Sequence, residues 1–201
     1  MSRIRMTPGF VLLLAAWYLF DGTGLFWCAV PAIALHECGH LLAIRAFGGQ
    51  AVRLTLSAAG LRLDYSGALS YRAEFFIALA GAVANLLCAL ACGGLLRLTG
   101  NTDFAYLAGT SLLLAAANLL PVEPLDGGEA LRAVLYQYCS PQTAARVLGT
   151  VSVLFSAAIL VFGLYIAFKT RYNISVLLLG CFLLAGKTIR HKERNPLWMS
   201  V

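Results

Sequence analysis

Residues 24–47 read GLFWCAVPAIALHECGHLLAIRAF, and Glu37 is the one formally charged residue of this stretch before Arg45. About 20 mostly apolar residues can cross ~30 Å of hydrocarbon as a helix. His36 and His40 are four residues apart, so on a helix both imidazoles project from one face and can bind the same metal ion. Glu37 stands beside them, where an HExxH zinc peptidase carries its general base. The stretch therefore predicts a membrane-spanning helix that holds a zinc site.

The composition indicates that the rest of the chain is also embedded in a bilayer. Of the 201 residues, 60% are hydrophobic and 12% are charged, with a mean hydropathy of +0.80. We predict an all-α polytopic membrane protein with a single domain over residues 1–201. The predicted spans cover about 7–20, 24–47, 75–98, 104–120, 144–168 and 174–187. The first span is short, and its helix could begin as early as Ile4.

A different pattern lies between the second and third spans. Apolar and polar residues alternate over about 52–65, on both sides of the small residues Ala58-Ala59-Gly60. Alternation with a period of two around such a turn is typical of a β-hairpin. We predict a short membrane-associated hairpin here.

Basic residues predict the orientation of the chain in the membrane. Arg3 and Arg5 before an apolar run could mark a signal peptide, but no small-x-small cleavage site follows, so we expect a retained helix. With six spans, three basic residues fall on one side: Arg97, Lys169 and Arg171. The other twelve share the opposite side: Arg3, Arg5, Arg45, Arg53, Arg62, Arg72, Arg132, Arg146, Lys187, Arg190, Lys192 and Arg194. The positive-inside rule makes that side, with both termini, cytoplasmic. The net charge of +6 then fits contact with anionic lipid, and no nucleic-acid binding is expected.

A third metal ligand is required, and residues 118–128, NLLPVEPLDGG, contain a candidate. Two prolines break the preceding helix, and paired glycines permit close approach of the backbone. Broken backbone at membrane depth must be sheltered by protein or line a wet cavity. Asp126 could complete a His₂Asp set here. Alternatively, Asp126 caps a following helix over Glu129–Tyr136.

Together, the two segments resemble the site-2 protease family of intramembrane metalloproteases. HECGH at 36–40 is similar to that family's HExxH helix, and NLLPVEPLDGG at 118–128 is similar to its NxxPxxPLDGG segment. Gly81-Ala82-Val83-Ala84-Asn85 is similar to its GPxxN motif, with alanine in place of proline. The hairpin after the HExxH helix and the basic C-terminal end resemble the subgroup of the stage IV sporulation protease, which implies a bacterial cell membrane. We expect neither that enzyme's CBS domain nor a PDZ insertion.

The resemblance implies a zinc endopeptidase that cuts membrane-anchored proteins. His36, His40 and Asp126 would bind Zn²⁺, which lowers the pKa of bound water to about 7, and Glu37 would move the proton. The resemblance alone gives Asn118 a role in stabilising the negative charge of the transition state. Asn85 could instead serve as polar glue between helices. We further hypothesise that an edge of the hairpin holds the unwound substrate by β-augmentation.

Two alternatives use the same ligands without proteolysis. A metal transporter needs several ionisable sites along a pathway, whereas this chain has one cluster with Glu37 in the base position. An inactive relative that only binds membrane proteins would not need Glu37. The six cysteines contain no CxxC pair, and we give Cys38 no catalytic role because it points away from the ligand face.

Overall fold

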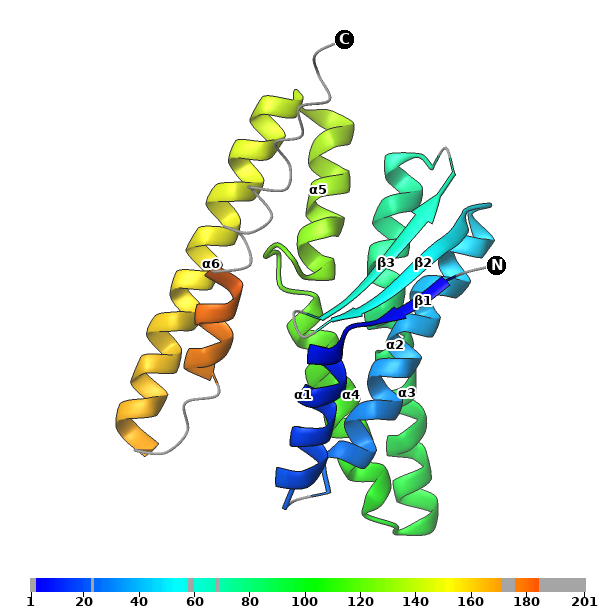
Figure 1. Cartoon of the computed structure of the whole chain (residues 1–201), viewed down its shortest axis with the longest axis vertical. Helices are drawn as coiled ribbons and strands as arrows, with labels where there is room; N and C mark the ends of the chain where they lie inside the picture. Colours follow the sequence, from blue (N-terminus) through cyan, green and yellow to red (C-terminus); the bar gives the residue numbers. More distant parts are fainter. Residues whose placement is uncertain (1–2, 23, 58–59, 68, 171–175, 185–201) are drawn as a thin grey trace. The chain divides into compact units, whose positions relative to one another are not determined.

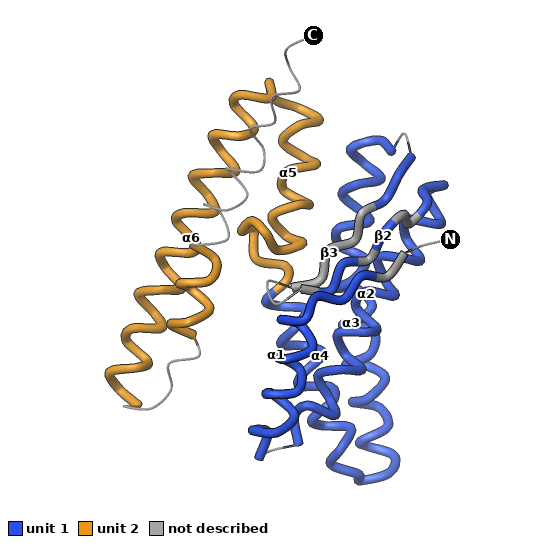
Figure 2. Tube along the Cα trace, in the orientation of Figure 1, with its two compact units in different colours: residues 1–117 blue, residues 118–201 orange. Residues whose placement is uncertain are grey.

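The computed structural model describes residues 3–22, 24–57, 60–67, 69–170 and 176–184, which form two compact units, 1–117 and 118–201 (Figures 1 and 2). The elements of the first unit are β1 (Arg3–Met6), α1 (Pro8–Phe20), α2 (Phe26–Ala46), β2 (Gln50–Ser57), β3 (Gly60–Ser66), α3 (Tyr71–Thr99) and α4 (Asp103–Asn118), whose last residue opens the second unit. The second unit continues with α5 (Asp126–Tyr138) and α6 (Pro141–Thr170), and residues 176–184 are also helical.

Helices occupy the positions predicted for the spans. The first five predictions correspond to α1, α2, α3, α4 and α6; the sixth overlaps the helix at 176–184, and its two ends lie outside the described residues. Among the described helices, α2, α3 and α6 are long and apolar enough to cross a membrane. α1 has 13 residues and α4 has 16, or about 20 and 24 Å of helix, less than the ~30 Å of hydrocarbon. The predicted count of six spans is therefore not confirmed by helix length.

The first helix begins at Pro8 and not at Ile4. Thr7 is its N-cap, since its hydroxyl accepts a hydrogen bond from the Phe10 N–H at 3.3 Å, and Pro8 takes the first helical position, where no backbone donor is needed. Ile4 belongs to β1 and pairs with Leu54. An early helix start was wrong because these residues complete a sheet.

The predicted hairpin is present as part of a larger sheet. β2 and β3 pair antiparallel, with Leu54 opposite Leu63, and β1 pairs parallel to β2 on its other side (Figure 1). The strand order is β1-β2-β3, so β2 is central. Among the described residues, the edge of the hairpin that carries no further strand is that of β3.

Small residues bring α2 and α3 into close contact. A Cβ placed on Gly39 of α2 would lie 2.6 Å from the Ala80 carbonyl oxygen and 2.9 Å from the Ala84 Cβ of α3. Ala32 and Ala82, in the same two helices, are fully buried. Close backbone approach at small residues is typical of helix pairs in membranes. It brings the histidine face of α2 against α3.

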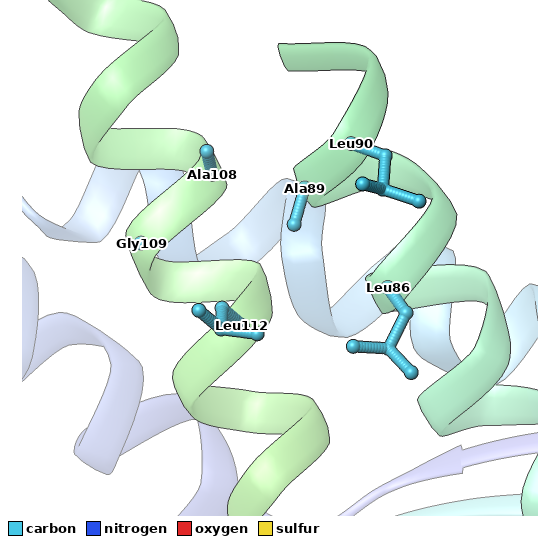
Figure 3. Close-up of a pocket in the computed structure, with 6 residues that line it drawn as sticks. All are labelled: Leu86, Ala89, Leu90, Ala108, Gly109 and Leu112. Carbon is cyan, nitrogen blue, oxygen red and sulfur yellow. The ribbon is translucent and has the colours of Figure 1, made fainter. Parts of the chain in front are cut away.

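An apolar groove of about 420 Å³ lies between α3 and α4 (Figure 3). Its lining residues are Leu86, Ala89, Leu90, Ala108, Gly109 and Leu112. None of them can bind a metal or transfer a proton, so the groove is not a site of hydrolysis.

In the second unit, residues 119–125 break the helical backbone, as the prolines predict. Val122 is fully buried, and the Glu123 N–H donates to the Ser152 hydroxyl of α6 at 3.2 Å. Gly127 and Gly128 are buried against the backbone of residues 119–123, where a Cβ on Gly128 would lie 2.6 Å from the Val122 carbonyl carbon. Protein thus shelters the middle of the broken segment at Val122 and at the Glu123 N–H.

Candidate metal centre

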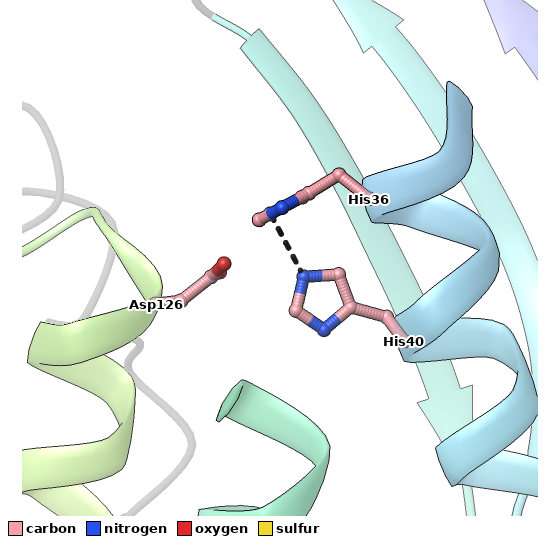
Figure 4. Close-up of side chains that lie close together, drawn as sticks. All are labelled: His36, His40 and Asp126. Carbon is pink, nitrogen blue, oxygen red and sulfur yellow. Dashed lines mark hydrogen bonds between the residues drawn. The ribbon is translucent and has the colours of Figure 1, made fainter. Parts of the chain in front are cut away.

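The two histidines of α2 project together toward α3. His36 and His40 are 5% and 9% exposed, and their Nε2 atoms lie 3.2 Å apart (Figure 4). The spacing of four residues on one continuous helix produces this arrangement, as the sequence predicted. Two imidazoles in contact within an apolar helix pair indicate a functional site, since ionisable groups are costly there.

Three positions of α3, each four residues apart, form a cradle for these rings. The His40 Nδ1–H donates to the Ile77 carbonyl oxygen at 2.8 Å. Gly81 leaves room, since a Cβ there would lie 2.5 Å from His40 Nε2 and 2.7 Å from His36 Nε2. Asn85 places its Nδ2 3.2 Å from His36 Nδ1. One stripe of α3 therefore fixes the back of each ring and leaves the two Nε2 atoms facing each other.

The separation of the Nε2 atoms fits a shared zinc ion. Tetrahedral zinc with Zn–N bonds of 2.0–2.1 Å holds two nitrogen ligands roughly 3.3 to 3.4 Å apart, close to the 3.2 Å in this protein. Each Nδ1 also lies against a polar group of α3, and such a second contact is typical of metal-binding histidines. The two residues thus fit a zinc ion in distance and in ring orientation.

Glu37 follows His36 directly and is half-buried, whereas Cys38 is exposed. Glu37 lies one residue around the helix from the first ligand, so its carboxylate is near the histidine face without occupying it. Cys38 lies on the opposite side of α2, as predicted, and has no access to the Nε2 atoms.

The remaining candidates belong to the second unit. Asn118 is the last residue of α4, and Asp126 is the half-buried first residue of α5, where the close approach of Gly127 and Gly128 fixes the backbone (Figure 4 draws Asp126). The N-cap of α5 is Leu125, whose side chain makes no cap hydrogen bond. Asp126 is thus the first residue of the helix and does not occupy the N-cap position. With His36 and His40 it supplies two imidazoles and one carboxylate, a donor set that suits zinc.

Sequence reasoning missed two parts of the cradle. The Ile77 carbonyl is a backbone group without a sequence signature. Gly81 was noted for its motif but not for the space it provides beside both imidazoles. The signal that could have found it is the spacing of Gly81 and Asn85, which equals that of the two histidines.

Comparisons with known proteins find a peptidase family and a similar fold. The model of Peptidase family M50 matches residues 99–162, which include the 118–128 segment but not HECGH. Among solved structures, the site-2 protease from Methanocaldococcus jannaschii is similar with a TM-score of 0.68 and 21% identity, over 92% of this chain and 88% of that one. No curated protein sequence matches the chain. The match to a peptidase family over part of the chain agrees with the resemblance that the motifs indicated, and the structural likeness shows a shared fold.

Proposed function

We propose that this chain, supported as a site-2 protease by motif, family match and fold, is an intramembrane zinc endopeptidase that hydrolyses membrane-anchored proteins. The observation that carries the proposal is the buried pair of imidazoles, with Nε2 atoms 3.2 Å apart and each Nδ1 against a group of α3. A bound zinc ion would supply Lewis-acid activation of water and of the substrate carbonyl.

Glu37 is the proposed general base and acid. Its carboxylate accepts a proton from the attacking water as the water oxygen bonds to the carbonyl carbon. It then returns the proton to the amide nitrogen as the C–N bond breaks, so that a carboxyl and an amine product form. Asn118 is the proposed donor to the negative charge that develops on the carbonyl oxygen, a role that rests on its place in the NxxPxxPLDGG segment.

Asp126 is the proposed third ligand. Its place in the 118–128 segment, its position at the start of α5 and the fixed backbone around Gly127 and Gly128 support this role. A carboxylate also balances part of the zinc charge within the low-dielectric membrane interior.

Asp126→Asn tests the ligand set and the function together. The amide binds zinc much more weakly than the carboxylate, so we expect zinc affinity to fall at least about 100-fold and cleavage of a membrane-anchored reporter to fall with it. Zinc content and cleavage are measured on the purified full chain. The matched control is Glu129→Gln, in the first turn of the same helix, whose half-buried side chain pairs with Arg132; it should retain both. A wild-type protein that binds no stoichiometric zinc, or an Asp126→Asn variant that binds it as tightly, would contradict the proposal.

The proposed substrate is a transmembrane or membrane-associated segment that unwinds before cleavage. Peptide bonds within a helix are poorly accessible, and an extended segment can pair with an exposed strand edge. Because β1 occupies one side of β2, the proposed docking edge is the outer edge of β3 (Gly60–Ser66).

Single prolines at Arg62 and Leu63 test this edge. Successive N–H groups of a strand point in opposite directions, so one proline removes a donor facing β2 and the other removes a donor facing the open edge. At the open-edge position we expect reporter cleavage to fall about 2- to 10-fold, the effect of losing one hydrogen bond to the substrate. Thermal stability should be unchanged there. The other position is the control, where stability falls. Unchanged cleavage in a folded open-edge variant would rule out pairing along β3.

The membrane arrangement is also proposed. Twelve of the fifteen Lys and Arg residues support six spans with both termini cytoplasmic. The hairpin β2–β3, which follows α2, supports the subgroup of the stage IV sporulation protease, and hence a bacterial cell membrane.

A further inference from the structure

Asn85 has an unusual environment for an amide. Its side chain is fully buried in α3, and its Oδ1 makes no hydrogen bond within the described part of the chain. The other end, Nδ2, lies 3.2 Å from His36 Nδ1. A buried polar atom without a partner is costly, so the amide is retained here at a cost to stability.

The two ring nitrogens of each histidine determine what Asn85 can do. A neutral imidazole carries one N–H donor and one acceptor. His40 must have its proton on Nδ1, because that atom faces a carbonyl oxygen, and its Nε2 is therefore an acceptor. As Asn85 Nδ2 is a donor, it pairs with an unprotonated His36 Nδ1, and the His36 proton lies on Nε2 and points to His40 Nε2. The hydrogen bonds thus form one continuous series in which Asn85 donates to His36, His36 donates to His40 and His40 donates to the Ile77 carbonyl oxygen.

This pattern of hydrogen bonds is not compatible with a metal on both Nε2 atoms. To bind zinc through Nε2, neutral His36 must carry its proton on Nδ1, which then needs an acceptor. Asn85 can supply one without leaving its place, because half a turn about its last torsion exchanges Nδ2 and Oδ1. The proton lost from His36 Nε2 is matched by the proton gained at Nδ1, so the ring stays neutral.

We propose that Asn85 is a positioning residue that selects the metal-binding tautomer of His36: with zinc bound, its Oδ1 accepts a hydrogen bond from His36 Nδ1–H. The inference rests on the proposed function, in which His36 and His40 are zinc ligands. Ile77 and Asn85 then have equivalent roles, as a backbone and a side-chain acceptor two helical turns apart on α3. The unbonded Oδ1 is explained as the acceptor that the metal-bound state uses.

Two substitutions separate an acceptor from a structural amide. Asn85→Asp keeps the acceptor and loses the donor, whereas Asn85→Leu is of similar size and has neither. We expect Asn85→Leu to weaken zinc binding about 10- to 100-fold and Asn85→Asp to bind it nearly as tightly as the wild type. The dissociation constant is measured on the full chain by competition with a chromophoric chelator. Ser111→Ala, which removes a fully buried hydroxyl of α4 that makes no hydrogen bond within the described residues, is the matched control and should not change this constant.

A purely structural amide gives a different result. If Asn85 only joins α2 to α3, both variants lower the thermal midpoint of the metal-free protein and leave the zinc affinity of the folded fraction unchanged, which would overturn the inference. Equally weak binding by Asn85→Asp and Asn85→Leu would overturn the acceptor role. If Asn85→Leu does not fold, ¹⁵N NMR of histidine-labelled, zinc-loaded wild type decides: we expect protonated Nδ1 on both rings, and an unprotonated His36 Nδ1 overturns the inference.

The proposed function is tested separately by the wild type and His40→Ala. Stoichiometric zinc in the wild type that is lost in His40→Ala supports the ligand set, whatever the Asn85 variants do. A wild type without zinc would remove the proposed function itself, and not only the role of Asn85.

Discussion

Glu37→Gln should abolish cleavage of a membrane-anchored reporter while zinc stays bound. Glutamine has nearly the same shape as glutamate but cannot accept a proton from water, and general acid–base groups contribute about 10²- to 10⁴-fold to rate. The zinc affinity should be preserved because the groups that hold the two rings, the Ile77 carbonyl and Asn85, lie on α3 and do not include Glu37. Zinc content is measured by elemental analysis and cleavage by gel, on the same preparations.

Cys38→Ser is the control for this substitution. It changes the next residue by one atom, on the exposed side of α2, and should leave both zinc and cleavage unchanged. Full proteolysis by Glu37→Gln would exclude the proposed mechanism. Loss of zinc together with activity would instead make Glu37 a ligand. Glu37→Gln also separates the protease from the two alternative functions. A metal transporter would retain its transport in this variant, and an inactive relative would show no cleavage even as the wild type.

Local pattern was sufficient to predict most elements of the fold. The apolar runs predicted where α1, α2, α3, α4 and α6 lie, and the alternation at 52–65 predicted the pairing of β2 with β3. These features depend on residues close together in the sequence. The number of membrane crossings could not be settled in this way, because α1 and α4 are shorter than a hydrocarbon core and length was the only criterion.

Long-range pairing was the part that the sequence did not reveal. β1 has only four residues, Arg-Ile-Arg-Met. Its first residue, Arg3, pairs with Arg53 of β2, which lies 50 positions away in the sequence. Such a short alternation before an apolar helix is easily assigned to the helix itself, and the early start at Ile4 was that error. The sheet is therefore larger than a hairpin, which leaves β3 as the open edge of that hairpin.

The candidate site was predictable in its ligands but not in their support. A spacing of four places His36 and His40 on one face of a helix whatever surrounds it. Which atoms meet the two Nδ1 positions depends on how α3 packs against α2, and one of them is a backbone oxygen. The sequence left two roles open for Asn85, as part of the motif at the site and as polar glue between helices. Only its distance from His36 distinguishes the two roles.

Gly81→Ala should remove zinc binding and cleavage while the protein stays folded. A Cβ at this position would lie 2.5 Å from His40 Nε2 and 2.7 Å from His36 Cε1 and Nε2, well inside van der Waals contact. The atoms that it meets belong to side chains and not to backbone, so the rings can move aside while the helix backbone stays in place. Alanine is also favoured over glycine within a helix by up to about 1 kcal/mol. The expected result is therefore a protein of equal or higher thermal stability whose two imidazoles no longer converge.

Zinc affinity should fall at least about 100-fold in Gly81→Ala, because displacement of the ligands themselves exceeds the effect of losing a supporting hydrogen bond. Gly93→Ala, on the same helix with open space around the added methyl group, is the matched control and should gain helix stability without loss of zinc. Affinity is measured by chelator competition and stability by thermal unfolding of the metal-free proteins. Because helix propensity changes equally in both variants, any difference in zinc binding reports the space beside the rings. If Gly81→Ala bound zinc as tightly as Gly93→Ala, the two Nε2 atoms would not be the groups that hold the metal.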